Sequence, residues 1–429
     1  MQETNMHSLC GSRKQNNLEK RGDMETKKDK LFIGAMSILI LLFLYGFITN
    51  INGDQGAVFC GRAGDYMADY YNVAEYAATR NPYGYGRETE YVDALQRMYP
   101  PLAYVIAYYQ SKAADYINFQ GPEAGRTNLG LATSAFFMFF CAAWFMLLIY
   151  SSIRKSGLYK ALILLCMMLS GIFIFSYERG NNIFLAALCS SFFVLNYNSE
   201  NKALAELSYV ALAIAAGLKV YPALLGILLI FDKNYKGAFR LILYGIAFGF
   251  LPFFFLEGGL RNIPILFKNL QKASELFEDL VFPRFNFRFW ASQIENAELK
   301  ALVYAVVKKL SALCCIAAVA ASYFQTQQWK RIMLILLALV IFPVNSAEYT
   351  GLYLFVGIIL FLNEKQWSLL DAFYMVFIVL ILNPFQVIVH ECNYTTWAMN
   401  LSASAMLILL LADTVYQMIK LRGHVKYGR

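Results

Sequence analysis

Apolar stretches separated by short polar turns run through most of this chain. The first of them, residues 31–51, reads LFIGAMSILILLFLYGFITNI, and a helix of roughly 20 such residues crosses a bilayer. Further apolar stretches follow at 129–151, 158–176, 181–197, 204–217, 219–232, 238–256, 303–324, 330–344, 350–363, 368–386 and 395–418. The pattern predicts an all-α, polytopic transmembrane helical bundle of about twelve membrane helices, within a range of roughly ten to thirteen.

Two longer polar regions interrupt the series of predicted membrane helices. Residues 52–128 are rich in tyrosine, and residues 257–302 contain interleaved arginine and aromatic residues. Within the first region, YPPLAYVIAYYQSKAADYI (99–117) has only a short apolar part and carries Lys112 and Asp115. We therefore expect this stretch to lie in the membrane interface. In the alternative topology it spans the membrane, which would move the next basic turn to the outer side.

The distribution of charge orients the bundle. Only 15% of the residues are charged and 59% are hydrophobic, whereas ordinary soluble domains carry about 25% charged residues. Because Lys and Arg favour cytosolic loops, we expect two cytosolic basic tails, a disordered one at 1–30 and a shorter one at 419–429. Residues 31–418 then form the membrane domain, with 52–128 and 257–302 as external loops. The net charge of +8 indicates orientation and not nucleic-acid binding, and we expect a bacterial cytoplasmic membrane.

Cysteine and histidine give no sign of a metal site. The eight cysteines are scattered, mostly in apolar stretches where a free Cys behaves as a small hydrophobe. The three histidines form no cluster with them, and no CxxC pair occurs, so neither a metal centre nor another cofactor is indicated. Cys60 and Cys392 would both face outward, and their spacing leaves open whether they form a disulfide.

Two close carboxylates follow the first predicted span, in GDYMADYYNVAEYAATRNPY (64–83). If residues 64–80 are helical, Asp65 and Asp69 share one face, because positions i and i+4 are neighbours on a helix. The segment therefore predicts either a functional site or an interfacial helix with a solvated acidic face and tyrosines at the lipid boundary.

Further charges lie at the predicted outer ends of the spans. Glu178 and Arg179 occupy a short turn, SYERGNN (176–182), where unpaired charge is expensive; they form either a functional pair or a structural one. Lys219 interrupts AIAAGLKVYPALLGILLI between a glycine and a proline. Such a break indicates a site, and its ammonium suits an anionic ligand such as a lipid-linked phosphate. Alternatively, Lys219 snorkels to the interface.

The second external region contains VFPRFNFRFWASQ (281–293), with Arg284 and Arg288 four residues apart among aromatic residues. Arginine beside aromatic rings can hold a phosphate while the rings stack on a sugar or a prenyl chain. It can equally touch lipid headgroups as part of an aromatic belt. Glu348, in NSAEYTG, begins a predicted span, where an acid also favours the helix dipole.

The order of these motifs resembles the polyprenol-phosphate-dependent glycosyltransferases of the GT-C superfamily, most closely glycosyltransferase family 87, which is alpha-mannosyltransferase-like. The resemblance rests on five segments: GDYMADYYNVAEYAATRNPY, MYPPLAYVIAYY, ERGNNIFLAAL, GLKVYPALLGILLIF and FPVNSAEYTGLYLFVGIILFL. In the last of them Glu348 stands where the family often has a histidine. The resemblance implies a GT-C-like fold with an external catalytic loop at 52–128.

The resemblance also implies an activity and residue roles. It implies inverting transfer of a mannose-like hexose from a polyprenyl-phosphate sugar to an extracytoplasmic glycan, lipid or protein acceptor, with no cofactor and with a metal only optional. Asp65 would be the general base, with Asp69 orienting the acceptor or taking the base role. Donor phosphate binding is expected of Lys219, Arg179, Arg284 and Arg288. Substrate binding is expected of Tyr70, Glu178, Asn181, Tyr221 and Glu348.

Two other functions are compatible with the sequence. A transporter or flippase of a lipid-linked or anionic substrate also uses broken helices and buried charge, but would place its charges near the bilayer midplane. An O-antigen polymerase- or ligase-like enzyme also uses lipid-linked sugars, but its main external loop is expected late in the chain. The early acidic loop favours the glycosyltransferase hypothesis over both.

Overall fold

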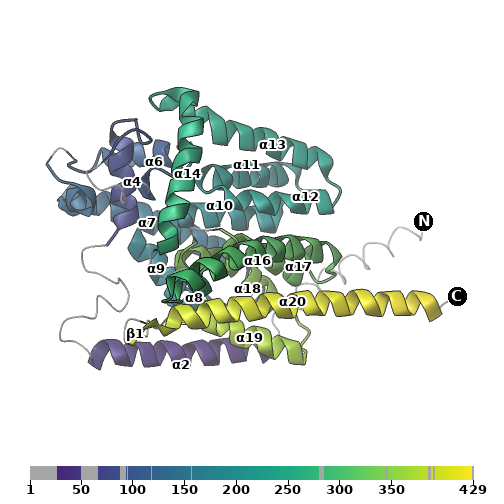
Figure 1. The fold of residues 1–429 in the computed structure, drawn as a ribbon. Helices are drawn as coiled ribbons and strands as arrows, with labels where there is room; N and C mark the ends of the chain where they lie inside the picture. Colours follow the sequence, from purple (N-terminus) through teal and green to yellow (C-terminus); the bar gives the residue numbers. More distant parts are fainter. Residues whose placement is uncertain are drawn as a thin grey trace, which may run out of the picture.

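The computed structural model describes residues 27–49, 66–86, 93, 95–116, 118–155, 157–279, 285–343, 346–384, 388–389 and 392–427. These residues are almost entirely helical, as the sequence predicts, and most of the longer helices run side by side (Figure 1). A two-residue antiparallel pair, β1 (Ile388–Val389) and β2 (Cys392–Asn393), aligns Val389 with Cys392.

Within the described residues, five helices are long and apolar enough to cross a membrane: α2 (Lys27–Thr49), α7 (Asn128–Ser152), α13 (Tyr235–Phe250) with its continuation η3 (Leu251–Phe255), α16 (Ala297–Phe324) and α20 (Tyr394–Tyr427). A sixth span results if α8 (Gly157–Met168) and α9 (Gly171–Arg179), bent by 53°, count as one broken helix. Every apolar stretch expected from the sequence contains a helix, but several of these helices are short. Since a helix rises about 1.5 Å per residue, 10 to 17 residues fall short of a hydrocarbon core of about 30 Å. Twelve spans therefore remain a prediction.

The shorter helices complete the bundle. They are α4 (Ala68–Ala78), α6 (Pro101–Ser111), η1 (Gly121–Arg126), α10 (Ile183–Asn196), α11 (Lys202–Leu218), η2 (Tyr221–Gly226), α12 (Ile227–Phe231), η4 (Gly259–Arg261), α14 (Asn262–Asp279), α15 (Phe289–Ser292), α17 (Gln328–Ile341), η5 (Glu348–Tyr353), α18 (Leu354–Asn363) and α19 (Leu369–Ile381). Helix α14 crosses the direction of the long helices (Figure 1).

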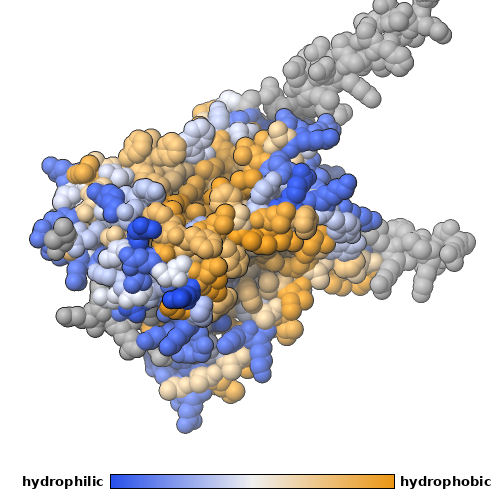
Figure 2. Space-filling model, turned by 90° about the horizontal axis from the view of Figure 1, so that it is seen from above, coloured by the Kyte–Doolittle hydropathy of each residue, from blue (hydrophilic) through white to orange (hydrophobic). Residues whose placement is uncertain are grey.

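The surface has the distribution of polarity that a membrane requires. Figure 2 shows an apolar band between two hydrophilic ends, one of them at the side of α4 and α6. Large apolar side chains on the long helices are exposed, among them Phe136 (68%), Phe239 (62%) and Ile316 (67%). So much contiguous exposed apolar surface is unusual for a soluble protein and fits contact with lipid. The chain is therefore a membrane protein.

Helix α4, part of the predicted helix 64–80, is buried in protein. Its bounds are narrower than expected because Met67 adopts the left-handed conformation just before it and Arg80 does so just after it (φ 54° and 61°). Tyr71 is fully inside, and its hydroxyl lies 2.7 Å from that of Ser134 on α7. Gly125 leaves room for the Tyr71 ring, which a Cβ at that position would meet at 1.9 Å. The interfacial-helix alternative, with tyrosines of α4 at the lipid boundary, is thus wrong for Tyr70 and Tyr71.

The turn between α9 and α10 holds α4 in place. Gly180 ends α9 with φ 66°, a conformation that favours glycine. A Cβ at this glycine would lie 2.7 Å from the sulfur of Met67, whose backbone N–H donates to the Glu178 carbonyl at 2.8 Å. This close approach directs the side chains on either side of Gly180 toward the first turn of α4.

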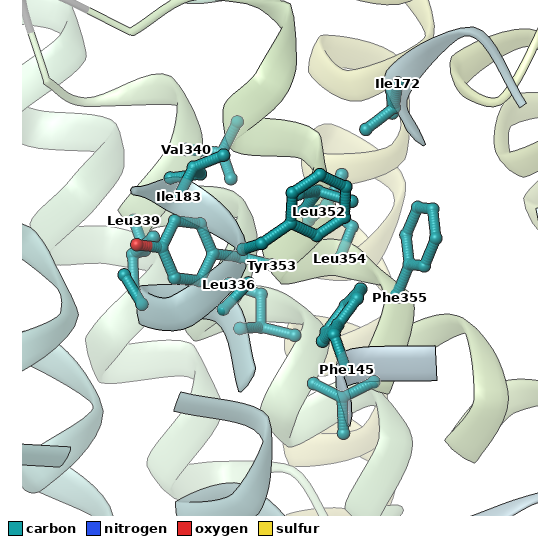
Figure 3. Close-up of a cluster of buried hydrophobic side chains, with 14 of the residues drawn as sticks. Phe145, Ile172, Ile183, Leu336, Leu339, Val340, Leu352, Tyr353, Leu354 and Phe355 are labelled. Atoms are coloured by element: carbon teal, nitrogen blue, oxygen red, sulfur yellow. The ribbon is translucent and has the colours of Figure 1, made fainter. Parts of the chain in front are cut away.

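A buried apolar cluster fixes η5 in the middle of the bundle. Leu352 and Tyr353 of η5 pack with Phe145 of α7, Ile183 of α10 and Leu336 of α17 (Figure 3). The η5 segment thus packs against three helices that are far apart in the sequence.

Buried ion pairs gather at the opposite end of the bundle from α4 (Figure 1). They join Lys28 to Asp371 (3.6 Å), Lys155 to Asp29 (2.9 Å) and Lys330 to Asp413 (2.7 Å). The pairs connect α2, α17, α19 and α20 and the segment after α7. Each of these cations lies beside a carboxylate that compensates its charge.

Candidate functional site

The site begins with Asp69 in the first turn of α4. Its Oδ1 accepts a hydrogen bond from Nη2 of Arg179 at 2.5 Å, and its Oδ2 accepts one from the amide of Asn181 at 2.8 Å. The Asp69 side chain is 13% exposed and that of Arg179 is 23% exposed. Gly180 places these two partners, on either side of itself, against one carboxylate.

This environment keeps Asp69 ionised. Burial alone raises the pKa of a carboxyl group, but the charge and hydrogen bond of Arg179, the amide of Asn181 and the charge of Lys219 lower it. The balance leaves the pKa of Asp69 below its ordinary value. Asp69 is therefore a fixed negative charge that holds Arg179 in position.

Lys219 supplies a second cation to the same site. It follows α11 in an extended conformation (φ −144°, ψ 120°), and Pro222 near the start of η2 continues the break that the sequence predicts. Its Nζ lies 4.4 Å from the ring centre of Tyr99 and 5.9 Å from that of Tyr349. Within the described residues the Lys219 ammonium forms no ion pair, so its charge is compensated only by ring faces and by the nearby Asp69.

Tyrosines line this group of charges. Burial raises the pKa of Tyr99, and the negative charge of the nearby Asp69 raises it further. Tyr221 meets Tyr353 edge to face, with ring centres 5.7 Å apart. Aromatic walls around fixed charges are typical of sites that bind a ligand with both polar and apolar parts.

The other predicted site residues lie around this centre. Tyr70 and Glu178 are buried where α4 meets α9, at 3% and 4% exposure. Glu348 is buried at the start of η5, where its Oε1 accepts a hydrogen bond from Thr396 of α20 at 2.6 Å. Their role in substrate binding stays a prediction.

Arg288 lies in a different environment. Its Nη1 donates to the hydroxyl of Tyr304 on α16 at 2.7 Å. None of its described contacts is with Asp69, Arg179 or Lys219. Asp65, Arg284, Cys60 and the side chain of Cys392 lie outside the residues that the structure describes.

Two aromatic residues of the centre were not singled out from the sequence. Tyr99 belongs to the Tyr-Pro-Pro segment and Tyr349 follows Glu348, so both lie in segments that carry the family resemblance. Their position in those segments is the sequence feature that could have identified them. That they meet one lysine depends on tertiary packing, which sequence order does not give.

The family model of glycosyltransferase family 87 matches residues 98–346, which is more than half of the chain. No curated protein and no solved structure matches. Arg179, Asn181 and Lys219 lie inside the matched region, and Asp69 and Tyr349 lie on either side of it. This chain belongs to glycosyltransferase family 87 and is a membrane glycosyltransferase.

Proposed function

We propose that this glycosyltransferase moves a hexose from a polyprenyl-phosphate carrier to an extracytoplasmic acceptor, with inversion, on a GT-C-like fold. The observation that carries the proposal is the Lys219 ammonium, which has no carboxylate partner among the described residues and lies beside the Asp69–Arg179 pair. A cation held this way is free to accept the phosphate of a donor, where negative charge develops as the sugar leaves.

The chemistry then needs one proton acceptor and one phosphate site. The acceptor hydroxyl attacks the anomeric carbon as the bond from that carbon to the phosphate oxygen breaks. The electron pair leaves with the polyprenyl phosphate, which Lys219 and Arg179 stabilise. Asp65 takes the hydroxyl proton, while Asp69 keeps Arg179 in position.

The orientation follows from the two ends of the bundle. The first turns of α2 and α17, which carry Lys28 and Lys330, lie at the end of the bundle opposite α4 (Figure 1), and basic residues favour the cytosolic side. We therefore place the site outside the cytosol and both termini inside it, in a bacterial cytoplasmic membrane. The acceptor is then an external glycan, lipid or protein.

The proposal is tested by transfer in vitro with the purified full chain and polyprenyl-phosphate hexoses, with mannose as the first sugar. We expect transfer by the wild type, loss of turnover in Asp65→Asn and weaker use of the donor in Lys219→Met. Full activity in both Asp65→Asn and Asp69→Asn would remove the base assignment. Movement of a solute across liposomes without consumption of a donor would favour the transporter hypothesis instead.

A further inference from the structure

Arg288 is a buried guanidinium with little to compensate it. The residue is 7% exposed, and its Nε is buried without a hydrogen-bond partner. A guanidinium has five N–H donors, and hydrogen bonds within the described residues use one, to Tyr304. No described carboxylate forms an ion pair with Arg288. Since an uncompensated buried charge is costly, the arrangement indicates a missing anionic partner.

Aromatic rings and an amide gather around α15, the short helix whose N-cap is Arg288. Phe289, Trp290 and Trp397 pack edge to face, with ring centres 5.0 to 5.4 Å apart. Both tryptophans are only half-buried, and the indole N–H of Trp397 donates to the Gln293 side chain at 3.2 Å. Half-exposed rings beside polar groups provide apolar faces and hydrogen bonds together, which suits a saccharide.

The η5 segment separates this cluster from Lys219. Tyr349 faces Lys219, while its neighbour Glu348 accepts from Thr396, the residue before Trp397. Successive residues of a 3₁₀-helix point about 120° apart, so η5 presents one side chain to each region. The Arg288 cluster is therefore a second region, linked to the first through η5.

We propose that Arg288, Gln293, Trp290 and Trp397 form an acceptor subsite for a saccharide that carries an anionic group, a phosphate or a carboxylate. This inference rests on the proposed function, and it gives the two cations separate tasks. Lys219 holds the donor phosphate, while the planar fork of Arg288 binds the acceptor anion. The tryptophan rings stack on the acceptor sugar.

The test is a binding titration of the purified full chain, followed by tryptophan fluorescence, with glucose 6-phosphate, glucuronic acid and neutral glucose as probes. We expect both anionic sugars to bind about 10-fold more tightly than glucose or better. Arg288→Gln should remove this preference, and Arg288→Lys should restore part of it because it keeps the charge and loses the fork. The matched surface variant Arg240→Gln should leave the preference unchanged.

Several results would overturn the subsite. Equal affinity for the charged and neutral sugars would do so, as would a preference that survives in Arg288→Gln. A preference lost in Lys219→Met would place the anion at the donor site. If Arg288→Gln does not fold, the same titration is made with Arg288→Lys and Trp397→Phe. The Trp397→Phe variant keeps an aromatic ring but loses the hydrogen bond to Gln293.

The subsite and the proposed function can fail separately. Charged-sugar binding that depends on Arg288, without transfer from any polyprenyl-phosphate hexose, would reject the proposed function alone. Transfer from such a donor, without preferential binding of the anionic sugars, would reject the subsite alone.

Discussion

Lys219 and Lys330 are two poorly exposed lysines, of which only Lys330 forms an ion pair within the described residues. Lys330 is 7% exposed and pairs with Asp413 at 2.7 Å, at the end of the bundle opposite the site. Lys219 contacts the rings of Tyr99 and Tyr349 and has no ion pair among the described residues. Replacing each by methionine keeps an unbranched side chain and removes the charge, so the two variants form a matched pair.

The two substitutions are expected to change different quantities, protein stability for Lys330→Met and donor affinity for Lys219→Met. Lys330→Met leaves the buried Asp413 carboxylate without its cation, which should lower the free energy of unfolding by about 3 kcal/mol. This is the lower end of the range for broken buried pairs, because Gln417 still donates to Asp413 at 2.9 Å. Lys219→Met loses two cation–π contacts, worth about 1 kcal/mol together, but also removes a charge that is costly to bury. We therefore expect its thermal stability to change little. Its donor affinity should fall roughly 10- to 150-fold, if a charge-assisted hydrogen bond contributes about 1.5 to 3 kcal/mol.

Two measurements on the same preparations decide between these outcomes. Thermal unfolding in detergent should show a clear loss for Lys330→Met and little change for Lys219→Met. Donor titration in the transfer assay, corrected for the folded fraction, should show a raised KM for the donor only in Lys219→Met. The reasoning fails if Lys219→Met is as destabilised as Lys330→Met and uses the donor normally, since Lys219 would then be a structural residue.

Four further outcomes follow from the site. Asp65→Asn should lower turnover about 10²- to 10⁴-fold; normal turnover in the transfer assay would pass the base role to Asp69. Asp69→Asn should lower the melting temperature, because Arg179 loses its carboxylate; an unchanged value would contradict a structural pair. Burial raises the pKa of Asp69, but Arg179 and Asn181 bring this pKa below its ordinary value. The ionised Asp69 therefore contributes fully to stability above the unfolded pKa of about 3.9, and this contribution disappears as the pH falls through the folded pKa. Melting temperatures from pH 5 to 2.5 should therefore fall more in wild type than in Asp69→Asn, and parallel curves would contradict this. Gly180→Ala forces a left-handed residue against α4, and both turnover and melting temperature should drop; a variant with wild-type values would show that the turn adjusts.

The sequence predicted the helices well because their signal is local. Each apolar stretch gave a helix, and the break at Lys219 could be recognised from the glycine and proline that flank it. The length of each helix was harder to predict, because whether an apolar helix needs 14 or 25 residues depends on its neighbours. The burial of helix α4 could not be predicted from the sequence. Its tyrosines suit a lipid boundary equally well, and only the packing partners from α7 and the segment before it decide that Tyr71 lies inside.

The charged residues of the site could be predicted from the sequence, but the pairing of acids with cations could not. Asp69, Arg179 and Lys219 are conspicuous in an apolar chain, and their shared membrane face follows from topology. Which acid meets which cation depends on Gly180, where the absence of a Cβ lets α4 approach the turn. Hydrophobic pattern carries no information about such a contact between segments more than 100 residues apart.

The geometry around Asp69 bears on which of the two early acids takes the proton. A general base works best when its pKa lies near the operating pH, because it must be ionised before attack and still accept a proton during it. Asp69 meets the first condition but not the second, since its pKa is lowered and its two oxygens already accept bonds from Arg179 and Asn181. Protonating Asp69 would also break the pair that, in the proposed mechanism, positions Arg179 for the departing phosphate. In the proposed mechanism the proton therefore needs a separate carboxylate, and Asp65 lies four residues before Asp69 in the sequence.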